Sequence, residues 1–204
     1  MAPVAAGDMT GVILAGGRGQ RLGGADKGLV QLAGKPLIEY VIAALQPQVG
    51  CLVISANRNR EIYAAYGFPV IADTVGEYYG PLAGMLSALR AAPTPYILTA
   101  PCDAPALPAD LAGRLSAALV RENAQACVAV CDGRMQPVFA LLRRALADDL
   151  QKYLECGGRG AGAWMHAQRA ATADFSDQAQ AFANINTPQA LAALAQRFGR
   201  HQGG

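Results

Sequence analysis

A run of glycines and cations between Leu14 and Lys27 contains the residue types in this sequence that are best suited to chemistry. The segment holds five glycines, and Arg18, Arg21 and Lys27 supply three positive charges. Glycine lets backbone N–H groups approach a phosphate without obstruction by a Cβ atom, and cations balance the charge of the phosphate. The segment therefore predicts a site for a polyphosphate.

Two familiar phosphate-binding motifs do not fit this segment. A dinucleotide fingerprint has a glycine three positions after its second glycine, and after Gly17 and Gly19 that position is Leu22. A P-loop requires lysine between glycine and serine or threonine, whereas Lys27 follows Asp26. The spacing thus argues against a nicotinamide-dependent oxidoreductase and against a P-loop enzyme.

Two carboxylates come directly after apolar runs that read as strands. Asp103 follows the run 96–100, and Pro101 and Pro105 restrict the backbone around it. A carboxylate beside a triphosphate suits Mg²⁺, which takes one or two carboxylates together with substrate phosphates. A helix cap or turn is the alternative role. Asp73 follows another strand, and it could contact the base, the ribose or a metal-bound water, or cap the next segment.

Histidine and cysteine provide no further catalytic cluster. His166 and His201 have no paired ligand nearby, and five cysteines without paired spacing argue against a disulfide framework. Cys127 and Cys131 could form half of a metal site, but both lie in an apolar run typical of a strand. We expect a reduced, cytoplasmic protein.

The composition is that of one folded domain. The 204 residues are 52% hydrophobic and 16% charged, with a net charge of +2, which argues against disorder and against a general nucleic-acid or membrane surface. No apolar run approaches the roughly 18–20 residues that span a bilayer. We expect a single domain over 1–204, with flexible ends at 1–9 and 199–204, that acts as a monomer.

Apolar periodicity alternates between strands and helices along the chain. Such alternation predicts an α/β domain with a mostly parallel sheet between two helix layers. The dipeptide Asp132-Gly133 predicts a hairpin, which would make the sheet mixed. We expect strands at 11–15, 51–55, 69–72, 96–100, 126–130, 135–141, 170–175 and 182–185, helices at 36–45, 61–66, 80–89, 108–122, 146–154 and 188–198, and a glycine-rich loop at 157–162.

Several motifs resemble those of the molybdenum cofactor guanylyltransferases of the MobA type, over nearly the whole chain. The first motif alone is shared by many nucleotidyltransferases, whereas the combination is more specific. The matching segments are Leu14-Ala-Gly-Gly17, Arg21-Leu-Gly-Gly-Ala-Asp-Lys-Gly28, Gly34-Lys-Pro-Leu37, Gly80-Pro-Leu-Ala-Gly-Met85, Pro101-Cys-Asp103 and Asn184-Ile-Asn-Thr-Pro188.

The resemblance implies a Rossmann-like, nucleotide-diphospho-sugar transferase-like fold and Mg²⁺-dependent transfer of GMP from GTP to molybdenum-bearing molybdopterin. Cofactor-delivery proteins and acceptor molybdoenzymes are the partners it implies. Lys27 matches the phosphate-binding lysine, Asp73 a GTP-contacting position, and Asp103 the position that contacts GTP and Mg²⁺. The matches to the nucleotide-binding strand exit and to the guanine-pocket stretch are Leu14, Ala15, Gly16, Gly17, Gly80 and Gly84.

Other assignments within this resemblance are less direct. Ser55 stands where the family often has a nucleotide-contacting asparagine, and Asn57 lies close by. We expect Arg21, Lys27 and Asp103 to stabilise the charge of the reacting phosphates. Candidates for the pterin side are Arg159, Asn184 and Asn186. The two asparagines could instead satisfy backbone groups in a turn.

Three alternatives remain at this stage. The first is a cytidylyltransferase for the same pterin, and the second is a sugar-phosphate nucleotidyltransferase. The third is a nucleotide-binding carrier without catalysis, which would keep the glycine-rich loop but would not need Asp103.

Overall fold

The structure is a computed structural model that describes residues 2–16, 26–74 and 80–182. Within these ranges a seven-stranded sheet has the order β5-β4-β1-β6-β8-β7-β9. The strands are β1 (Met9–Leu14), β4 (Cys51–Ser55), β5 (Val70–Ile71), β6 (Tyr96–Pro101), β7 (Ala126–Cys131), β8 (Arg134–Arg143) and β9 (Ala171–Asp174). Strands β5, β4, β1 and β6 are parallel, whereas β8 is antiparallel to β6 and to β7. The predicted mixed sheet is confirmed.

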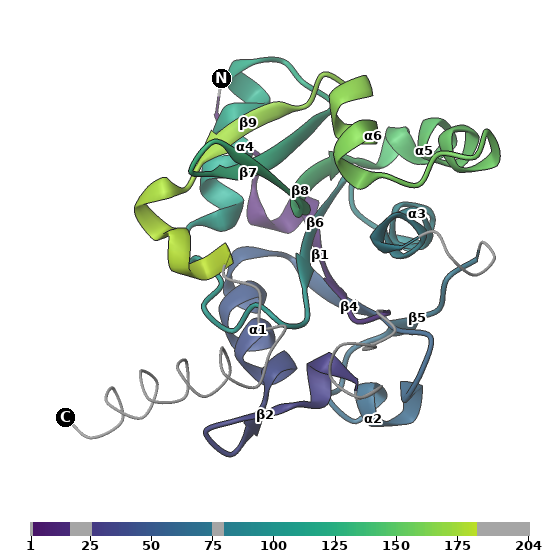
Figure 1. Ribbon diagram of the computed structural model, residues 1–204, viewed down its shortest axis with the longest axis vertical. Helices are drawn as coiled ribbons and strands as arrows, with labels where there is room; N and C mark the ends of the chain where they lie inside the picture. The colour runs from purple at the N-terminus through teal and green to yellow at the C-terminus, as the bar shows by residue number, and fades with distance from the viewer. Residues whose placement is uncertain (1, 17–25, 75–79, 183–204) are drawn as a thin grey trace.

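Helices cover both faces of the sheet, as the alternating pattern predicts. They are α1 (Leu37–Leu45), α2 (Arg60–Ala64), α3 (Pro81–Ala91), α4 (Leu111–Arg121), α5 (Ala147–Glu155) and α6 (Ala161–Ala167). One hydrophobic cluster joins α1, α2 and α4 to the sheet, and a second joins α3, α5 and α6 to it. Figure 1 shows α1 and α4 on one side of the central strands and α3, α5 and α6 on the other.

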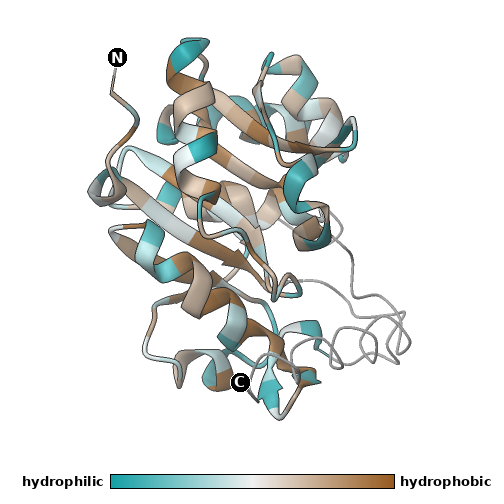
Figure 2. Ribbon diagram, turned by 90° about the vertical axis from the view of Figure 1, so that its left-hand side faces the viewer, coloured by the Kyte–Doolittle hydropathy of each residue, from teal (hydrophilic) through white to brown (hydrophobic). Residues whose placement is uncertain are grey.

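The hydrophobic pattern explains why these elements form. In α1, four fully buried side chains recur on one face, and the apolar stripe they make packs on the sheet. Strand β1 is buried along almost its whole length, as expected of a central parallel strand. Figure 2 shows hydrophobic residues gathered along the inner strands and hydrophilic residues mostly on the surrounding helices and connections.

The predicted hairpin at Asp132-Gly133 joins β7 to β8. Both turn residues have positive φ, 48° and 72°, as a two-residue hairpin turn requires. Strand β8 then bulges, because Val128 pairs with Ala140 while Ala129 pairs with Gln136. The hydroxyl of Thr99 in β6 donates to the Val138 carbonyl at 2.9 Å, which ties the bulge to the parallel half of the sheet.

Several elements differ from the sequence-based expectation. Helix α6 begins inside the segment that we predict to be a glycine-rich loop, and a small hairpin of β2 (Gln31–Leu32) and β3 (Lys35–Pro36) is additional. Phe182 ends the 3-10 helix η6 (Ser176–Phe182) instead of starting a strand. The rest of that predicted strand and the predicted helix 188–198 lie outside the described residues.

The remaining short elements are 3-10 helices. They are η1 (Ala6–Asp8), η3 (Lys27–Leu29), η4 (Gln46–Gln48) and η5 (Arg144–Leu146). Near the N-terminus the backbone N–H of Val4 donates to the Ser116 hydroxyl of α4. Within the described parts of the chain, no helix has the length and apolar character needed to cross a membrane.

Candidate nucleotide site

Four parallel strands end side by side and create one edge on which the candidate residues gather. Leu14 is in register with Ser55 on one side and with Pro101 on the other. The next backbone N–H groups continue the ladder, since Ala15 donates to Ser55 and Cys102 donates to Leu14, at 2.8 and 3.1 Å. The residues that follow these strands are Gly16, Asn57, Asp73 and Asp103.

The strand order places a binding crevice at this edge. After β1 the chain first adds β4 and β5 on one side and later adds β6 on the other side. At such a switch point the connections leave in opposite directions, and open α/β sheets bind ligands in the crevice between them. The predicted phosphate segment begins directly after β1, at this crevice.

Lys27 and Asp103 form an ion pair at the edge. The Lys27 Nζ atom lies 2.8 Å from Asp103 Oδ2, and the side chains are 26% and 12% exposed. Lys27 starts η3, whereas Asp103 comes two residues after β6 ends. The structure therefore brings together the two residues that sequence reasoning selected for phosphate and metal. At this contact the Lys27 ammonium can face the negative charge of a phosphate. The Asp103 carboxylate can face the positive charge of a metal ion bound to that phosphate.

A second group lies one strand further along the same edge. The Asn57 Nδ2 group donates to Asp73 Oδ2 at 2.7 Å, and the Asp73 backbone N–H donates to Asn57 Oδ1 at 2.9 Å. A Cβ atom on Gly16 would lie 3.5 Å from Asn57 Nδ2 and 4.0 Å from Asp73 Oδ2. Gly16, Asn57 and Asp73 thus form one polar group. From the sequence alone, Asn57 is indicated only by its nearness to Ser55.

The environment of Asp73 opposes its ionisation. Burial raises the pKa of the Asp73 carboxyl above its ordinary value, and the hydrogen bond from Asn57 partly offsets this effect. A partly desolvated carboxylate that already accepts one amide can still accept hydrogen bonds from a ligand. This is a suitable environment for binding ribose hydroxyls or base N–H groups.

Ser55 and Gly84 face each other inside the protein. Ser55 is 1% exposed, and a Cβ atom on Gly84 of α3 would lie 2.6 Å from Ser55 Oγ and 2.9 Å from Leu14 Cδ2. The glycine lets α3 approach the ends of β1 and β4. The structure therefore places the Ser55 hydroxyl against a helix, while Asn57 presents its amide at the exposed edge.

Gly80 determines where α3 begins. Its φ and ψ of 59° and −147° belong to a backbone conformation that side chains with a Cβ atom rarely adopt, and Pro81 follows at the first helical position. Helix α3 is thus the next element along the chain after β5 and Asp73 in the described residues. The residues 75–79 between them lie outside the described residues.

Arg159, the described candidate for the pterin side, lies just after the end of α5. Its guanidinium donates to the carbonyls of Leu154 and Gly158, at 3.1 and 2.7 Å, and so caps the C-terminal end of α5. His166 is exposed on α6. The other sequence-based candidates lie outside the described residues: Gly17, Arg18, Arg21, Asn184, Asn186 and His201.

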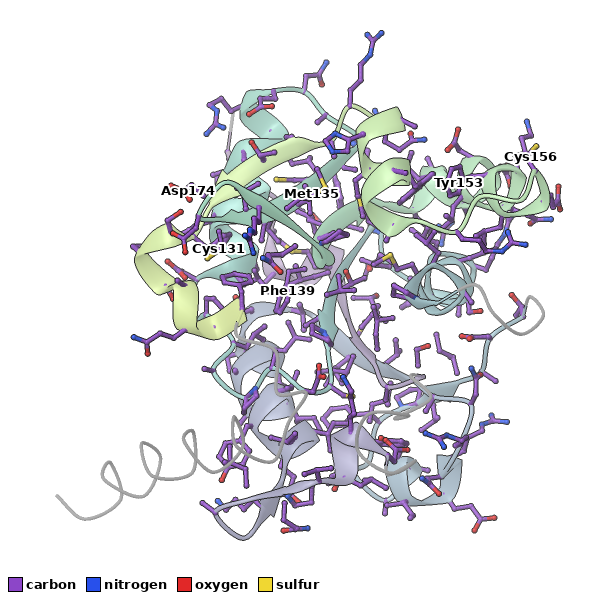
Figure 3. All side chains as sticks on the ribbon, in the orientation of Figure 1. Cys131, Met135, Phe139, Tyr153, Cys156 and Asp174 are labelled. Carbon is purple, nitrogen blue, oxygen red and sulfur yellow. The ribbon has the colours of Figure 1, made fainter. Side chains whose placement is uncertain are left out.

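The last described residues reach the bulged part of β8. The Phe182 ring lies 4.8 Å from the Phe139 ring and 5.5 Å from the Phe175 ring, centroid to centroid. Figure 3 shows Phe139 nearer the middle of the molecule than Cys131 and Asp174, which lie on the outer strands, while Cys156 is on the opposite side, directly after α5. The last described residue, Phe182, therefore packs against the antiparallel half of the sheet.

The described residues contain no group of three or more histidine, cysteine or acidic side chains that could hold a metal ion by itself. The alternative of a Cys127–Cys131 metal site accordingly has no further ligands there, and both thiols are buried in β7. A single carboxylate at a phosphate site still fits Mg²⁺, because this ion keeps waters and takes substrate oxygens as ligands. Asp103 provides the hard oxygen that such a site requires.

Comparison with known sequences places this geometry among nucleotidyltransferases. A family model described as a MobA-like NTP transferase domain matches residues 11–173. A molybdenum cofactor guanylyltransferase from Ralstonia nicotianae is 49% identical over 199 residues, covering 93% of this chain and 97% of that protein. Another, from Shewanella sediminis, is 47% identical over 178 residues, covering 87% of this chain and 91% of that protein.

Solved structures share the architecture. Molybdopterin-guanine dinucleotide biosynthesis protein A from Archaeoglobus fulgidus has a TM-score of 0.74 at 24% identity, covering 94% of this chain and all of that one. The 2-C-methyl-D-erythritol 4-phosphate cytidylyltransferase from Thermus thermophilus has a TM-score of 0.68 at 20% identity, covering 98% and 100%. At these identities the likeness concerns the fold, and it confirms the expected nucleotide-diphospho-sugar transferase-like class.

Proposed function

Because the chain belongs to the MobA-like NTP transferase family, we propose that it transfers GMP from GTP to molybdopterin carrying molybdenum, with release of pyrophosphate. The observation that carries the proposal is the Lys27–Asp103 pair at the ends of β1 and β6, in a chain 49% identical to a molybdenum cofactor guanylyltransferase over nearly its whole length. The chain is thus a nucleotidyltransferase.

The reaction needs no nucleophile from the protein. An oxygen of the terminal phosphate of the pterin forms a bond to the α-phosphorus of GTP. The bond from that phosphorus to the oxygen bridging to the β-phosphate breaks, and pyrophosphate leaves with the electron pair. Since the attacking phosphate is already ionised, no strong general base is required. Catalysis then depends on position and on charge stabilisation.

Lys27 and Asp103 are proposed to interact with opposite charges in the substrate complex. The Lys27 ammonium donates to phosphate oxygens of the nucleotide and balances the charge that grows on the leaving pyrophosphate. Asp103 would hold Mg²⁺, which when bound supplies Lewis-acid neutralisation of the phosphate oxygens. The ion pair keeps both side chains at the crevice before the substrate arrives. Arg21, outside the described residues, is proposed to add a second cation.

The nucleoside end is proposed to bind at the polar group formed by Gly16, Asn57 and Asp73. The exposed backbone of Gly16 permits close approach, and the Asn57 side chain holds Asp73 in place by donating to its carboxylate and accepting from its backbone N–H. A guanine or ribose donor can pair with the remaining acceptor positions of Asp73. Gly80 and Gly84 support this end by fixing the start and the close packing of α3.

The test is nucleotide choice with an identified product. Purified protein is incubated with Mg²⁺, molybdenum-loaded molybdopterin and equal GTP, CTP and UTP, and pyrophosphate release and the mass of the pterin product are measured. We expect the guanine dinucleotide to dominate, with no pyrophosphate released when the pterin is omitted. Dominant cytidine product would replace the guanylyl assignment with the cytidylyl one, and turnover with a sugar phosphate instead would overturn both.

A further inference from the structure

The segment that carries Lys27 is attached to the protein by a buried phenol. Tyr63 of α2 is 0% exposed, and its hydroxyl donates a hydrogen bond to Asp26 Oδ1. Asn59, directly before α2, donates from Nδ2 to Asp26 Oδ2 at 2.9 Å. Both carboxylate oxygens of Asp26 are therefore held by one short segment of chain, through hydrogen bonds strengthened by the carboxylate charge.

The Tyr63 hydroxyl also lies against Gly28, the residue on the other side of Lys27. A Cβ atom on Gly28 would lie 2.7 Å from the Tyr63 hydroxyl oxygen and 3.2 Å from Cys102 Cβ. The backbone of η3 thus rests directly on Tyr63 and on the residue before Asp103. Gly28 is buried, and only glycine leaves room for this approach. Tyr63 therefore contacts both neighbours of Lys27 in the sequence.

These contacts fix the two partners of the ion pair relative to each other. Lys27 stands between Asp26 and Gly28, both of which meet Tyr63, while Gly28 packs on Cys102, next to Asp103. The Cys102 backbone N–H is in turn bonded to the end of β1. The lysine turn is accordingly packed between the Tyr63 hydroxyl and the strand end that bears the carboxylate.

Burial raises the pKa of the Tyr63 phenol well above its ordinary value, and the hydrogen bond to Asp26 raises it further. The hydroxyl consequently keeps its proton and remains a donor across the physiological range. The rest of the ring belongs to the hydrophobic cluster on the α1 side of the sheet. A substitution that removes the hydroxyl but keeps the ring can therefore test the role of the hydroxyl alone.

We propose that Tyr63 is a positioning residue for nucleotidyl transfer: its hydroxyl holds the Asp26–Gly28 turn so that Lys27 reaches Asp103 and the substrate phosphates together. This inference rests on the proposed function for the identity of the nucleotide. The hydroxyl touches neither substrate nor metal in this scheme. Because it acts through Lys27, removing the hydroxyl should weaken nucleotide binding only in a protein that retains Lys27.

A double-mutant cycle tests that dependence. Tyr63→Phe keeps the buried ring and removes the hydroxyl. By calorimetry, we expect it to weaken Mg-GTP binding by roughly tenfold, the size of one hydrogen bond to a charged group. In a Lys27→Ala background the same substitution should change the affinity by less than about twofold. Tyr66→Phe is the matched control, since Tyr66 makes no described hydrogen bond to Asp26 and should leave binding unchanged.

A second readout needs no nucleotide. Acetylation of Lys27 by acetic anhydride, followed by mass spectrometry, should be faster in Tyr63→Phe than in the unchanged protein, because the lysine is held less firmly against Asp103. Asn59→Ala should give a smaller increase, because it removes only the more exposed of the two Asp26 contacts. If Tyr63→Phe does not fold, Asn59→Ala is used in the same cycle.

Equal losses of affinity with and without Lys27, or unchanged binding and labelling in Tyr63→Phe, would overturn the positioning role. These outcomes are separate from failure of the proposed function. If another nucleotide binds better than GTP, the guanylyl assignment fails, and the cycle is measured with that nucleotide. If none binds, the labelling rates still decide whether the hydroxyl positions Lys27.

Discussion

Lys27 and Asp103 are 76 positions apart in the sequence, yet the ammonium nitrogen of one lies 2.8 Å from a carboxylate oxygen of the other. In the proposed function, a phosphate would replace Asp103 as the partner of Lys27. A divalent cation would replace Lys27 as the partner of Asp103. In the proposed function, the pair would therefore couple nucleotide binding to metal binding.

We expect Lys27→Ala to weaken GTP binding by about 10- to 100-fold, the loss of a charge-assisted phosphate contact. In the absence of nucleotide the same substitution should tighten binding of Mn²⁺ used as a probe for Mg²⁺, since the competing ammonium is gone. Calorimetry measures both. Arg121→Ala, an exposed cation on α4, is the control and should change neither. Equal GTP affinity in Lys27→Ala would contradict the phosphate role.

Asp103→Asn should reduce turnover by at least roughly 100-fold while leaving the fold intact, because the amide keeps the shape but loses the charge that attracts Mg²⁺. Pyrophosphate release across a Mg²⁺ titration checks the first expectation, and thermal unfolding checks the second. Asp148→Asn, at an exposed aspartate of α5, serves as the control. A variant with unchanged turnover would favour the non-catalytic carrier.

Gly84→Ala tests the packing of α3 on the strand ends. Alanine improves helix propensity by about 1 kcal/mol, but overpacking against Ser55 and Leu14 should cost about 1–3 kcal/mol. We expect net destabilisation in urea unfolding, and a smaller cost in a Ser55→Ala background, where the nearest atom has been removed. Simple additivity of the two substitutions would show that the hydroxyl does not set the spacing.

The Asp73 carboxyl should make stability depend on pH in a defined direction. Its folded-state pKa is raised, so burying the charged form costs stability above that pKa, and the cost disappears below the unfolded-state pKa. Asp73→Asn should therefore raise the melting temperature near neutral pH, and the gain should shrink as the pH falls to the unfolded-state pKa. The variant should bind GTP more weakly. A gain that grew at acidic pH would contradict this account.

Local patterns were sufficient to predict most of the sheet and the residues at its edge. Strand β4 coincides with the predicted range, and the Asp132-Gly133 dipeptide marks the hairpin because few other residue pairs accept positive φ twice. The sequence indicates Asp73 and Asp103 because a polar residue just after an apolar strand must lie at the edge where the strand ends. Each of these signals depends only on neighbouring residues.

The features that were missed depend on contacts between distant residues. Helix α6 contains Gly162 and is short, so propensity disfavours it, yet buried Trp164 holds it through a 3.0 Å hydrogen bond to Asp149 of α5. The contact of Tyr63 with Asp26 spans 37 positions and has no local signature. Ser55 aligned with a binding position, but the strand alternation turns its hydroxyl towards α3.

The placement of β6 beside β1 has a consequence for how the protein folds. The residues at the candidate edge come from Gly16 to Asp103, and they meet only after the chain has crossed over the sheet several times. Such nonlocal closure is slow relative to helix formation. A partly synthesised chain that ends before β6 lacks Asp103, so under the proposed function a nucleotide would bind fully only to the completed parallel half. Ligand-induced protection against unfolding, about 2.7 kcal/mol at 100 times the Kd, would then report on maturation of the whole sheet.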